Sequence, residues 1–565
     1  MQMDHILSKY CPRIEFDSYK DFFENFRIDV PEDFNFGYDV IDEWARVEPE
    51  KKALLWCDDH GEEREFTFTE ISQLSNRIAN SLRSLGIGKG DVVLLILRRR
   101  WEYWITAVAL HKLGAILIPG SLQLTKKDIV YRASSADVKM MICVDDDYVV
   151  EQTEAALPEV PSVRNKVIVA GSREGWISYD ELLEGGSPEF ERPTGDQRTC
   201  SSDTMLIYFT SGTTGMAKMV MHSFAHPLGH IITAKYWQQV RENRLHLSVS
   251  DSGWAKFGWG KIYGQWIAGA ELFAYDMDKF VPTRLLQKMQ DYKLTTFCAP
   301  PTMYRFMLQE DVASYDLSSI VNFATAGEPL NPEVTKQWRE ATGKAIREGF
   351  GQSEGPVLLA NFPWIEPKPG SMGKPSPLLN IKLLDDDGNE CEDGEEGAIC
   401  VTRLREAYPP GLFVGYYRNP ELTAEAVGGD VYNLHDMAWR DPDGYFTFIG
   451  RNDDVIKCSG YRIGPFEVES ALIEHPAVVE CAVTAAPDPI RGNVVKATIV
   501  LAAGYEPSDE LVKELQTHVK KATAPYKYPR IVEFVDELPK TLGGKIKRAL
   551  LRKEAEEAAK AAETR

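Results

Sequence analysis

An alternation of short apolar runs with helical stretches constrains the fold more than any other feature of the sequence. Residues 92–118 have the pattern of a strand, a helix and a second strand. Further apolar runs of strand length follow at 140–144, 166–170, 205–209, 295–299 and 320–325. This alternation is typical of layered α/β structure with a largely parallel sheet. We therefore predict an α/β protein.

The chain has 565 residues, which is too long for one simple core. Residues 378–403 carry hairpin signals, which predict a small β unit after the α/β body. A turn-rich stretch at 441–460 then precedes a compact alternation of helices and strands, long enough for a small α+β domain. We predict a large domain over residues 1–452 and a small domain over 453–565.

Composition and charge exclude several classes of protein. The chain is 44% hydrophobic and 26% charged, as in globular proteins, and its apolar runs are shorter than the roughly 18 residues of a membrane helix. Its net charge of −21 disfavours a nucleic-acid partner. The nine cysteines form no CxxC pair, and acidic residues such as Asp4 and Glu15 argue against a transit peptide. We therefore expect a cytoplasmic location. An oligomer is compatible with the sequence.

One motif has the character of a phosphate-binding loop. Residues 208–218 read Tyr-Phe-Thr-Ser-Gly-Thr-Thr-Gly-Met-Ala-Lys, an apolar strand followed by hydroxyls, glycines and a lysine. Glycines let backbone N–H groups approach a phosphate closely, and hydroxyls and lysine add hydrogen bonds and charge. The spacing of the glycines excludes a Walker A loop. The candidate phosphate ligands are Thr210, Ser211, Gly212, Thr213, Thr214, Gly215 and Lys218.

This string resembles the signature of the AMP-forming adenylating enzymes, a superfamily of acyl-CoA synthetases, luciferases and peptide synthetase adenylation domains. Ala217 stands where the family usually has proline. Two further motifs that resemble the family follow in order, and the resemblance implies that they bind ATP. They comprise Gly327, Glu328 and Pro329 at the adenine, and then Glu348, Gly349, Phe350, Gly351, Gln352, Ser353 and Glu354.

The resemblance also implies roles for single residues. Phe350 would stack near adenine, and the Ser353 hydroxyl would reach the α-phosphate. Glu354 would hold Mg²⁺, a hard cation that prefers oxygen ligands. A dinucleotide site is excluded, because no glycine follows Gly349 and Gly351 at the required spacing.

Later motifs extend the resemblance into the small domain. Asp436 and Arg451 match the family's ribose contacts, and Asp453 matches its hinge residue. Residues 539–545, Pro-Lys-Thr-Leu-Gly-Gly-Lys, end in Lys545, which matches the catalytic lysine between the carboxylate and the α-phosphate. A positioned cation there offsets the repulsion between two anions that must meet.

The small domain resembles medium-chain acyl-CoA synthetases in particular, and is relatively richer in cations than the rest of the chain. In that branch the loop at Gly460 lines a pantetheine tunnel. The candidate CoA residues are Ser459, Gly460, Tyr461, Arg462, Arg491, Lys520, Tyr528, Pro529 and Arg530.

The sequence offers candidates for some of the residues that line the acyl pocket. Acetate-specific relatives close the pocket with tryptophan where this chain has Gly351, so that closure is absent here. Residues of the segment that lines the pocket are Trp254, Lys256 and Trp259, and Cys298 is a second wall candidate. Ordinary core packing would explain Trp259 and Cys298 equally well. We expect a small-to-medium acyl chain that can be branched.

The predicted activity is ATP-dependent formation of acyl-AMP, followed by transfer of the acyl group to CoA with release of AMP and pyrophosphate. The cofactors and substrates would be ATP, Mg²⁺, CoA and a small carboxylic acid. Two alternatives remain open at this level. One is an adenylating enzyme with another acceptor, such as a carrier protein or oxygen, and the other is a binding module that has lost the chemistry. Intact Glu354, Asp436, Arg451 and Lys545 disfavour the second.

Three histidines suggest a different chemistry. His222, His226 and His230 are spaced to share one helix face, as metal ligands can. Pro227 interrupts that pattern, and no cysteine or carboxylate completes a site. A metal site is therefore disfavoured.

Overall fold

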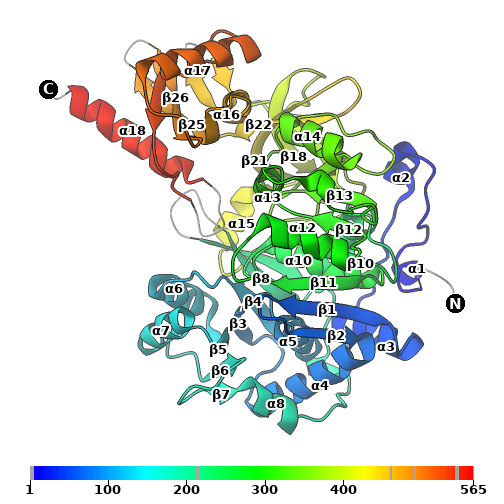
Figure 1. The fold of residues 1–565 in the computed structure, drawn as a ribbon. Coiled ribbons are helices and arrows are strands. Elements are labelled where there is room, and N and C mark those ends of the chain that lie inside the picture. Colours follow the sequence, from blue (N-terminus) through cyan, green and yellow to red (C-terminus); the bar gives the residue numbers. More distant parts are fainter. Residues whose placement is uncertain (1–4, 211–216, 459–460, 489–490, 541–545, 564–565) are drawn as a thin grey trace.

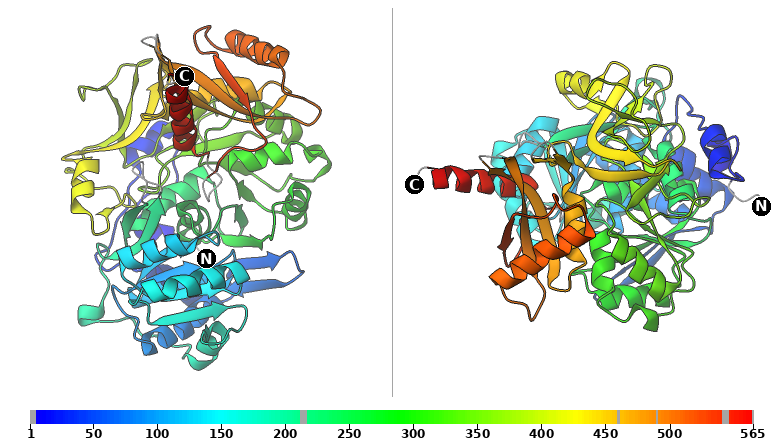
Figure 2. Two further views of the ribbon diagram at one scale, coloured as in Figure 1. Left: turned by 90° about the vertical axis from the view of Figure 1, so that its left-hand side faces the viewer. Right: turned by 90° about the horizontal axis from the view of Figure 1, so that it is seen from above.

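A computed structural model describes residues 5–210, 217–458, 461–488, 491–540 and 546–563. A large body carries a small C-terminal domain on the side away from the N-terminus (Figures 1 and 2). No helix within these ranges is long and apolar enough to cross a membrane.

The first sheet confirms the predicted strand–helix–strand unit. β3 (Val92–Ile96) and β4 (Ile116–Gly120) pair in parallel, and α5 (Glu102–Leu113) connects them. The sheet has the order β19-β9-β8-β4-β3-β5-β6-β7. Its other strands are β5 (Val138–Val144), β6 (Asn165–Val169), β7 (Ile177–Ser178), β8 (Thr204–Thr210), β9 (Lys218–Ser223) and β19 (Gly415–Tyr416).

The second sheet contains a parallel part in the order β14-β13-β12-β10-β11-β1, with β2 antiparallel at its edge. These strands are β1 (Lys52–Asp58), β2 (Glu63–Thr67), β10 (Leu245–Ser248), β11 (Glu271–Asp276), β12 (Thr296–Cys298), β13 (Asn322–Thr325) and β14 (Ile346–Phe350). The two sheets share one continuous hydrophobic core. α5 is buried along its whole length, and its Trp104 Nε1 donates to the carbonyl of Lys261 (2.8 Å).

The predicted β unit is present and continues the second sheet. β15 (Leu359–Ala360) and β16 (Ser371–Pro375) join β14 to the antiparallel strands β22-β21-β18-β17. These four strands are β17 (Asn380–Leu384), β18 (Glu396–Thr402), β21 (Val431–Arg440) and β22 (Phe446–Arg451). In this sheet the two short strands β15 and β16 therefore separate β22 from β14.

The C-terminal domain has its own hydrophobic core beneath a mostly antiparallel sheet. The predicted alternation of helices and strands is confirmed. The strands are β23 (Ile456–Cys458), β24 (Tyr461–Ile463), β25 (Val478–Asp488), β26 (Gly492–Leu501) and β27 (Ile531–Phe534). The helices are α16 (Pro465–Ile473), α17 (Asp509–Ala522) and α18 (Arg548–Glu563).

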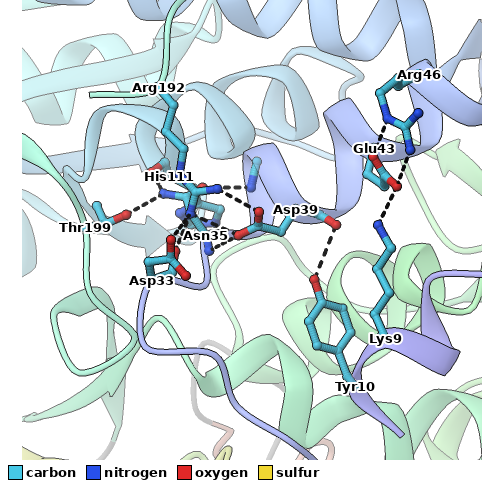
Figure 3. Close-up of polar contacts among 11 residues, drawn as sticks. Lys9, Tyr10, Asp33, Asn35, Asp39, Glu43, Arg46, His111, Arg192 and Thr199 are labelled. Carbon is cyan, nitrogen blue, oxygen red and sulfur yellow. Dashed lines mark hydrogen bonds and ion pairs between the residues drawn. The ribbon is translucent and has the colours of Figure 1, made fainter. Parts of the chain in front are cut away.

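Polar side chains tie the N-terminal segment to the body (Figure 3). Asn35 Nδ2 donates to the carbonyl of His111 (2.7 Å) and to Thr199 Oγ1 (3.1 Å), and all three residues are buried. Arg192 Nη1 donates to Asp39 Oδ1 at 2.7 Å. The first 45 residues thus brace the end of α5 without contributing to the cavity described next.

Candidate active site

A cavity of about 400 Å³ lies between the strand ends of the large body and the C-terminal domain. Loops after β13 and β14 form one wall of the cavity, and β21 and β22 form a second. Helix α16 of the C-terminal domain forms the third. The sequence-predicted residues that it brings together are Thr210, Lys218, Gly327, Glu328, Pro329, Glu348, Gly349, Phe350, Gly351, Gln352, Ser353, Glu354, Asp436 and Arg451.

The topology explains why residues so distant in sequence meet. β13 and β14 are parallel neighbours, with Thr325 opposite Glu348, so the segments that follow them leave the sheet at the same edge. Asp436 on β21 lies opposite Arg451 on β22 in the antiparallel register. The two predicted ribose contacts are therefore adjacent on one face.

Predicted residues that the structure leaves undescribed are Ser211, Gly212, Thr213, Thr214, Gly215, Ser459, Gly460 and Lys545. Ile546 follows Lys545 and lines the cavity. The lysine itself lies outside the described residues, and so does the side chain of Arg462.

Gln352 and Asp436 are held by one hydrogen-bond network. Gln352 Nε2 donates to Asp436 Oδ2 (2.5 Å) and to the carbonyl of Leu434 (2.8 Å). The Tyr432 hydroxyl donates to Gln352 Oε1 at 2.9 Å. Burial raises the pKa of Tyr432 well above its usual value, so it remains a neutral donor. The network fixes the carboxylate that the family pattern assigns to ribose.

Glu354 is oriented by a residue that sequence reasoning missed. Its carboxylate is nearly buried, and Tyr416 donates its hydroxyl to Oε1 at 3.1 Å. Burial, together with the negative charge of Glu354, raises the pKa of Tyr416. Tyr416 comes from β19, a two-residue strand that pairs with β9 and shows no sequence motif.

Glu348 differs from the other predicted nucleotide contacts. It is buried, and burial raises its pKa to about 8, so its carboxyl group is protonated at neutral pH. The backbone N–H of Leu330 donates to Oε1 at 3.3 Å. Glu348 thus presents little charge to a nucleotide and connects β14 to the segment that holds Gly327–Pro329.

Trp259 packs against Gly351, a residue that lines the cavity, without lining the cavity itself. A Cβ added to Gly351 would lie 2.3 Å from Trp259 Cη2. Trp259 belongs to α10 (Ala255–Lys261), is 5% exposed, and its Nε1 has no hydrogen-bond partner among the described residues. Trp237 packs against Gly349 in the same way, since a Cβ added to Gly349 would lie 2.5 Å from Trp237 Cε2. No pattern in the sequence pointed to Trp237.

The remaining pocket candidates also lie outside the cavity lining. Lys256 Nζ donates to the carbonyl of Ala326 (2.6 Å), which ties α10 to the segment predicted at the adenine. Trp254 is the residue before α10 and is half-buried. Cys298 ends β12 and is 1% exposed.

Two family models match the chain. The AMP-binding enzyme model matches residues 41–417, and the AMP-binding enzyme C-terminal domain matches residues 467–545. The chain belongs to the AMP-binding enzyme family. Acyl-coenzyme A synthetase ACSM3 of Mus musculus is 44% identical over 552 residues, covering 95% of this chain and 93% of its own length. Acyl-coenzyme A synthetase ACSM4 of Homo sapiens is 44% identical over 534 residues, covering 93% and 91%.

Solved structures support the same conclusion. An anthranilate CoA ligase in complex with anthranoyl-AMP matches with a TM-score of 0.85 and 29% identity, covering 94% of this chain and 99% of its own. An acyl-CoA synthetase from Brucella canis matches with a TM-score of 0.73 and 30% identity, covering 96% and 99%. This AMP-binding enzyme is an acyl-CoA synthetase, which forms acyl-AMP from an acid and ATP and then a thioester with CoA.

The expected cytoplasmic location is wrong. The ACSM3 and ACSM4 relatives are named as mitochondrial proteins, which contradicts it. The expectation rested on unpaired cysteines and on a few N-terminal acidic residues. Reduced thiols report the redox state of a compartment and do not identify the compartment.

In this AMP-binding enzyme the described CoA candidates lie apart from the cavity lining, and three of them form a cluster. Lys520 Nζ lies 3.9 Å from the ring centroid of Tyr528, and Arg530 Nη1 donates to the Tyr528 hydroxyl at 2.7 Å. Tyr461 stacks on Tyr526 with ring centroids 4.2 Å apart. Pro529 accepts a hydrogen bond from Gln516 Nε2, and the backbone N–H of Arg491 donates to Asp488 Oδ1.

The predicted hinge residue is bound on both sides. Asp453 Oδ1 lies 3.2 Å from Arg451 Nε, and Asp453 Oδ2 lies 3.9 Å from Nη2 of Arg552 on α18, which also pairs with Asp454. Arg548, also on α18, donates to both carboxylate oxygens of the buried Glu469 on α16. Contacts of α18 thus extend from the hinge to the face of α16 that closes the cavity.

The three histidines do not share one helix face. His222 lies on β9, whereas His226 and His230 belong to α9 (His226–Ile231). His222 Nε2 donates to the carbonyl of Ser353 at 2.7 Å, and burial lowers the pKa of His222 to about 4. The described residues contain no cluster that could hold a metal ion. His222 instead fixes the backbone between Gln352 and Glu354.

Proposed function

We propose that this synthetase activates small-to-medium carboxylic acids, including branched ones. The observation that carries the proposal is the indole of Trp259 packed directly behind Gly351, which lines the cavity. Glycine at position 351 leaves room for that indole, and the indole then fills the space into which a long acyl chain would extend. Cys298, buried at the end of β12, is a second candidate for this wall.

In the first half-reaction the acid's carboxylate oxygen forms a bond to the α-phosphorus as the bond to the β-phosphate breaks, and pyrophosphate leaves. Asp436 and Arg451 position the ribose. Lys545 offsets the repulsion between carboxylate and α-phosphate, with Ser353 and the loop 210–218 at the phosphates.

Glu354 fits Mg²⁺ because it is a nearly buried carboxylate that lines the nucleotide cavity and is oriented by Tyr416. When bound, the ion would neutralise charge on phosphate oxygens.

In the second half-reaction the CoA sulfur bonds to the acyl carbon, and the carbon–oxygen bond to AMP breaks. Lys520, Tyr528 and Arg530 suit the phosphates of CoA, since two cations flank an aromatic ring. Because this cluster lies outside the cavity lining, we propose that the small domain turns at Asp453 between the two half-reactions. We place the domain boundary there, between residues 452 and 453.

The test is ATP–pyrophosphate exchange with straight and branched acids of about two to twelve carbons, followed by thioester formation with CoA. A maximum at short, medium or branched acids supports the proposal. A maximum at the longest acids contradicts it, because the indole would then not limit the chain.

A further inference from the structure

A second cavity of about 530 Å³ adjoins the nucleotide cavity. Four residues line both, and so form the neck between them: Lys218, Tyr416, His435 and Arg451. The second cavity is also lined by Ala217 and Met219 and by Asp453. Because Lys218 ends the phosphate loop, the neck lies where the phosphates beyond the α-phosphate would extend.

His435 is directed into the neck by an unusual backbone. It lies within β21 but has φ +60°, in the left-handed region that costs free energy for a residue with a Cβ. Its N–H donates to Asn433 Oδ1 (2.8 Å), and its carbonyl accepts from the backbone N–H of Asn452 (2.9 Å). These two hydrogen bonds hold the conformation.

The consequence is visible in the cavity lining. Leu434, His435 and Asp436 are consecutive, yet all three line the nucleotide cavity. In a regular strand successive side chains point to opposite faces, so three neighbours could not share one cavity. The strained residue therefore adds one side chain, His435, to the cavity wall beside the ribose carboxylate.

The imidazole of His435 is available to a ligand. It forms no hydrogen bond with any residue that the structure describes. Lys218 on β9 and Arg451 on β22 face it, and partial burial together with these cations lowers its pKa. The carboxylates of Asp453 and Glu425 raise the pKa of His435, and Asp436 is the next residue along β21. Two fixed cations beside a titratable third form a surface suited to a polyanion.

We propose that His435 binds the diphosphate portion of ATP, which departs as pyrophosphate, and that it does so in its protonated form beside Lys218 and Arg451. The proposal rests on the proposed placement of the nucleotide in the larger cavity. The negative charge of a bound diphosphate favours the imidazolium, so binding takes up a proton at neutral pH. CoA also contains a diphosphate. Measuring the two half-reactions separately distinguishes a contact with the diphosphate of ATP from a contact with that of CoA.

The test uses two variants of the full-length enzyme. His435→Asn keeps a residue that tolerates the left-handed backbone and removes the titrating group, whereas His435→Gly removes the side chain and relaxes the backbone. Binding of inorganic pyrophosphate with Mg²⁺ is measured by calorimetry in buffers of different ionisation enthalpy. Subtracting the proton uptake of the variant from that of the wild type cancels the protons that pyrophosphate itself takes up or releases.

We expect both variants to bind pyrophosphate and ATP about tenfold more weakly near pH 6.5, the effect of one charge-assisted hydrogen bond. This difference should shrink towards pH 8.5, and the wild type alone should show the additional proton uptake. Thioester formation from acyl-AMP and CoA should be unchanged. Thermal melting verifies folding, and His435→Gly should be at least as stable as the wild type.

Wild-type affinity and proton uptake in His435→Asn would overturn the proposal. Impairment of the CoA half-reaction alone would also overturn it, by assigning the histidine to the diphosphate of CoA. Asp436→Ala tests the nucleotide placement separately: it should weaken ATP binding and leave pyrophosphate binding intact. If Asp436→Ala leaves ATP binding unchanged, the proposed nucleotide site fails, whatever the His435 variants show.

Discussion

The indole of Trp259 lies over Gly351, so that a Cβ at position 351 would approach Trp259 Cη2 to 2.3 Å and the carbonyl oxygen of Pro356 to 2.8 Å. The glycine and the tryptophan are therefore complementary, and neither can change without affecting the other. This contact is the basis for the proposal that α10, through Trp259, limits the acyl pocket.

Replacing Trp259 by alanine should open space behind Gly351 and so extend the cavity. We expect kcat/KM for acids two or more methylenes longer than the preferred one to rise about tenfold, since each buried methylene contributes on that scale. The KM for ATP should stay constant. Trp176→Ala, which removes a tryptophan that does not pack against Gly351, is the matched control. An unchanged chain-length profile in Trp259→Ala would exclude the indole as the wall.

Gly351→Ala should impair the enzyme through the same contact. We expect a loss of about tenfold or more in kcat/KM for the acid, because the new methyl group displaces the indole. Combining it with Trp259→Ala should restore part of the activity, since the clash with the indole disappears and the contact with Pro356 persists. Additive losses in the double variant would show that the two residues act independently.

Tyr416→Phe should weaken the first half-reaction specifically. Loss of the hydrogen bond to Glu354 leaves the carboxylate less well oriented, and we expect about tenfold slower pyrophosphate exchange, partly recovered at high Mg²⁺. Thioester formation from supplied acyl-AMP should be unaffected. Tyr148→Phe, on the exposed face of a distant helix, is the control. Equal losses in both half-reactions would indicate a general structural defect.

The sequence predicted more of the fold than of the site. The apolar runs that begin residues 92–118 and that span 140–144 became the buried parallel strands β3 and β5, because a strand covered on both faces must be apolar throughout. Motif residues such as Gln352 and Asp436 were found because their spacing is local. Tyr416 and Trp237 were not found, since each reaches the site from a distant segment through tertiary packing. No local pattern distinguishes such aromatic residues from core residues.

The location was mispredicted for a related reason. Net charge and unpaired cysteines constrain the ligands and the redox state that a chain encounters, and several compartments share those conditions. Similarly, the sequence did not predict that the His435 side chain lies on the cavity side of β21. Its left-handed backbone depends on hydrogen bonds to Asn433 and Asn452.

Glu348 should make stability depend on pH. Its pKa is raised from 4.5 to about 8 by burial, so the folded state holds a proton that the unfolded state releases between those values. The free energy of unfolding therefore falls as pH rises from 4.5 to 8, by about a few kcal/mol in total, and this contribution is constant outside that window. Glu348→Gln keeps the shape and lacks the ionisation. As pH rises across this range, the melting temperature of the variant should rise relative to that of the wild type. If the two plots of melting temperature against pH are parallel, Glu348 is already ionised in the folded protein.

The cluster around Tyr528 should matter only when CoA is present. Lys520 and Arg530 both contact the Tyr528 side chain, and all three residues lie outside the nucleotide cavity lining. Lys520→Ala and Arg530→Ala should therefore raise the KM for CoA by about tenfold each, the scale of one charge-assisted contact to phosphate. Pyrophosphate exchange should remain at the wild-type rate.

Lys521→Ala removes the same charge from the adjacent exposed position on α17 and is the matched control. If Lys521→Ala raises the KM for CoA equally, the effect comes from the general positive field of the domain. If neither lysine variant nor Arg530→Ala changes it, CoA approaches the acyl-AMP along another face of the small domain.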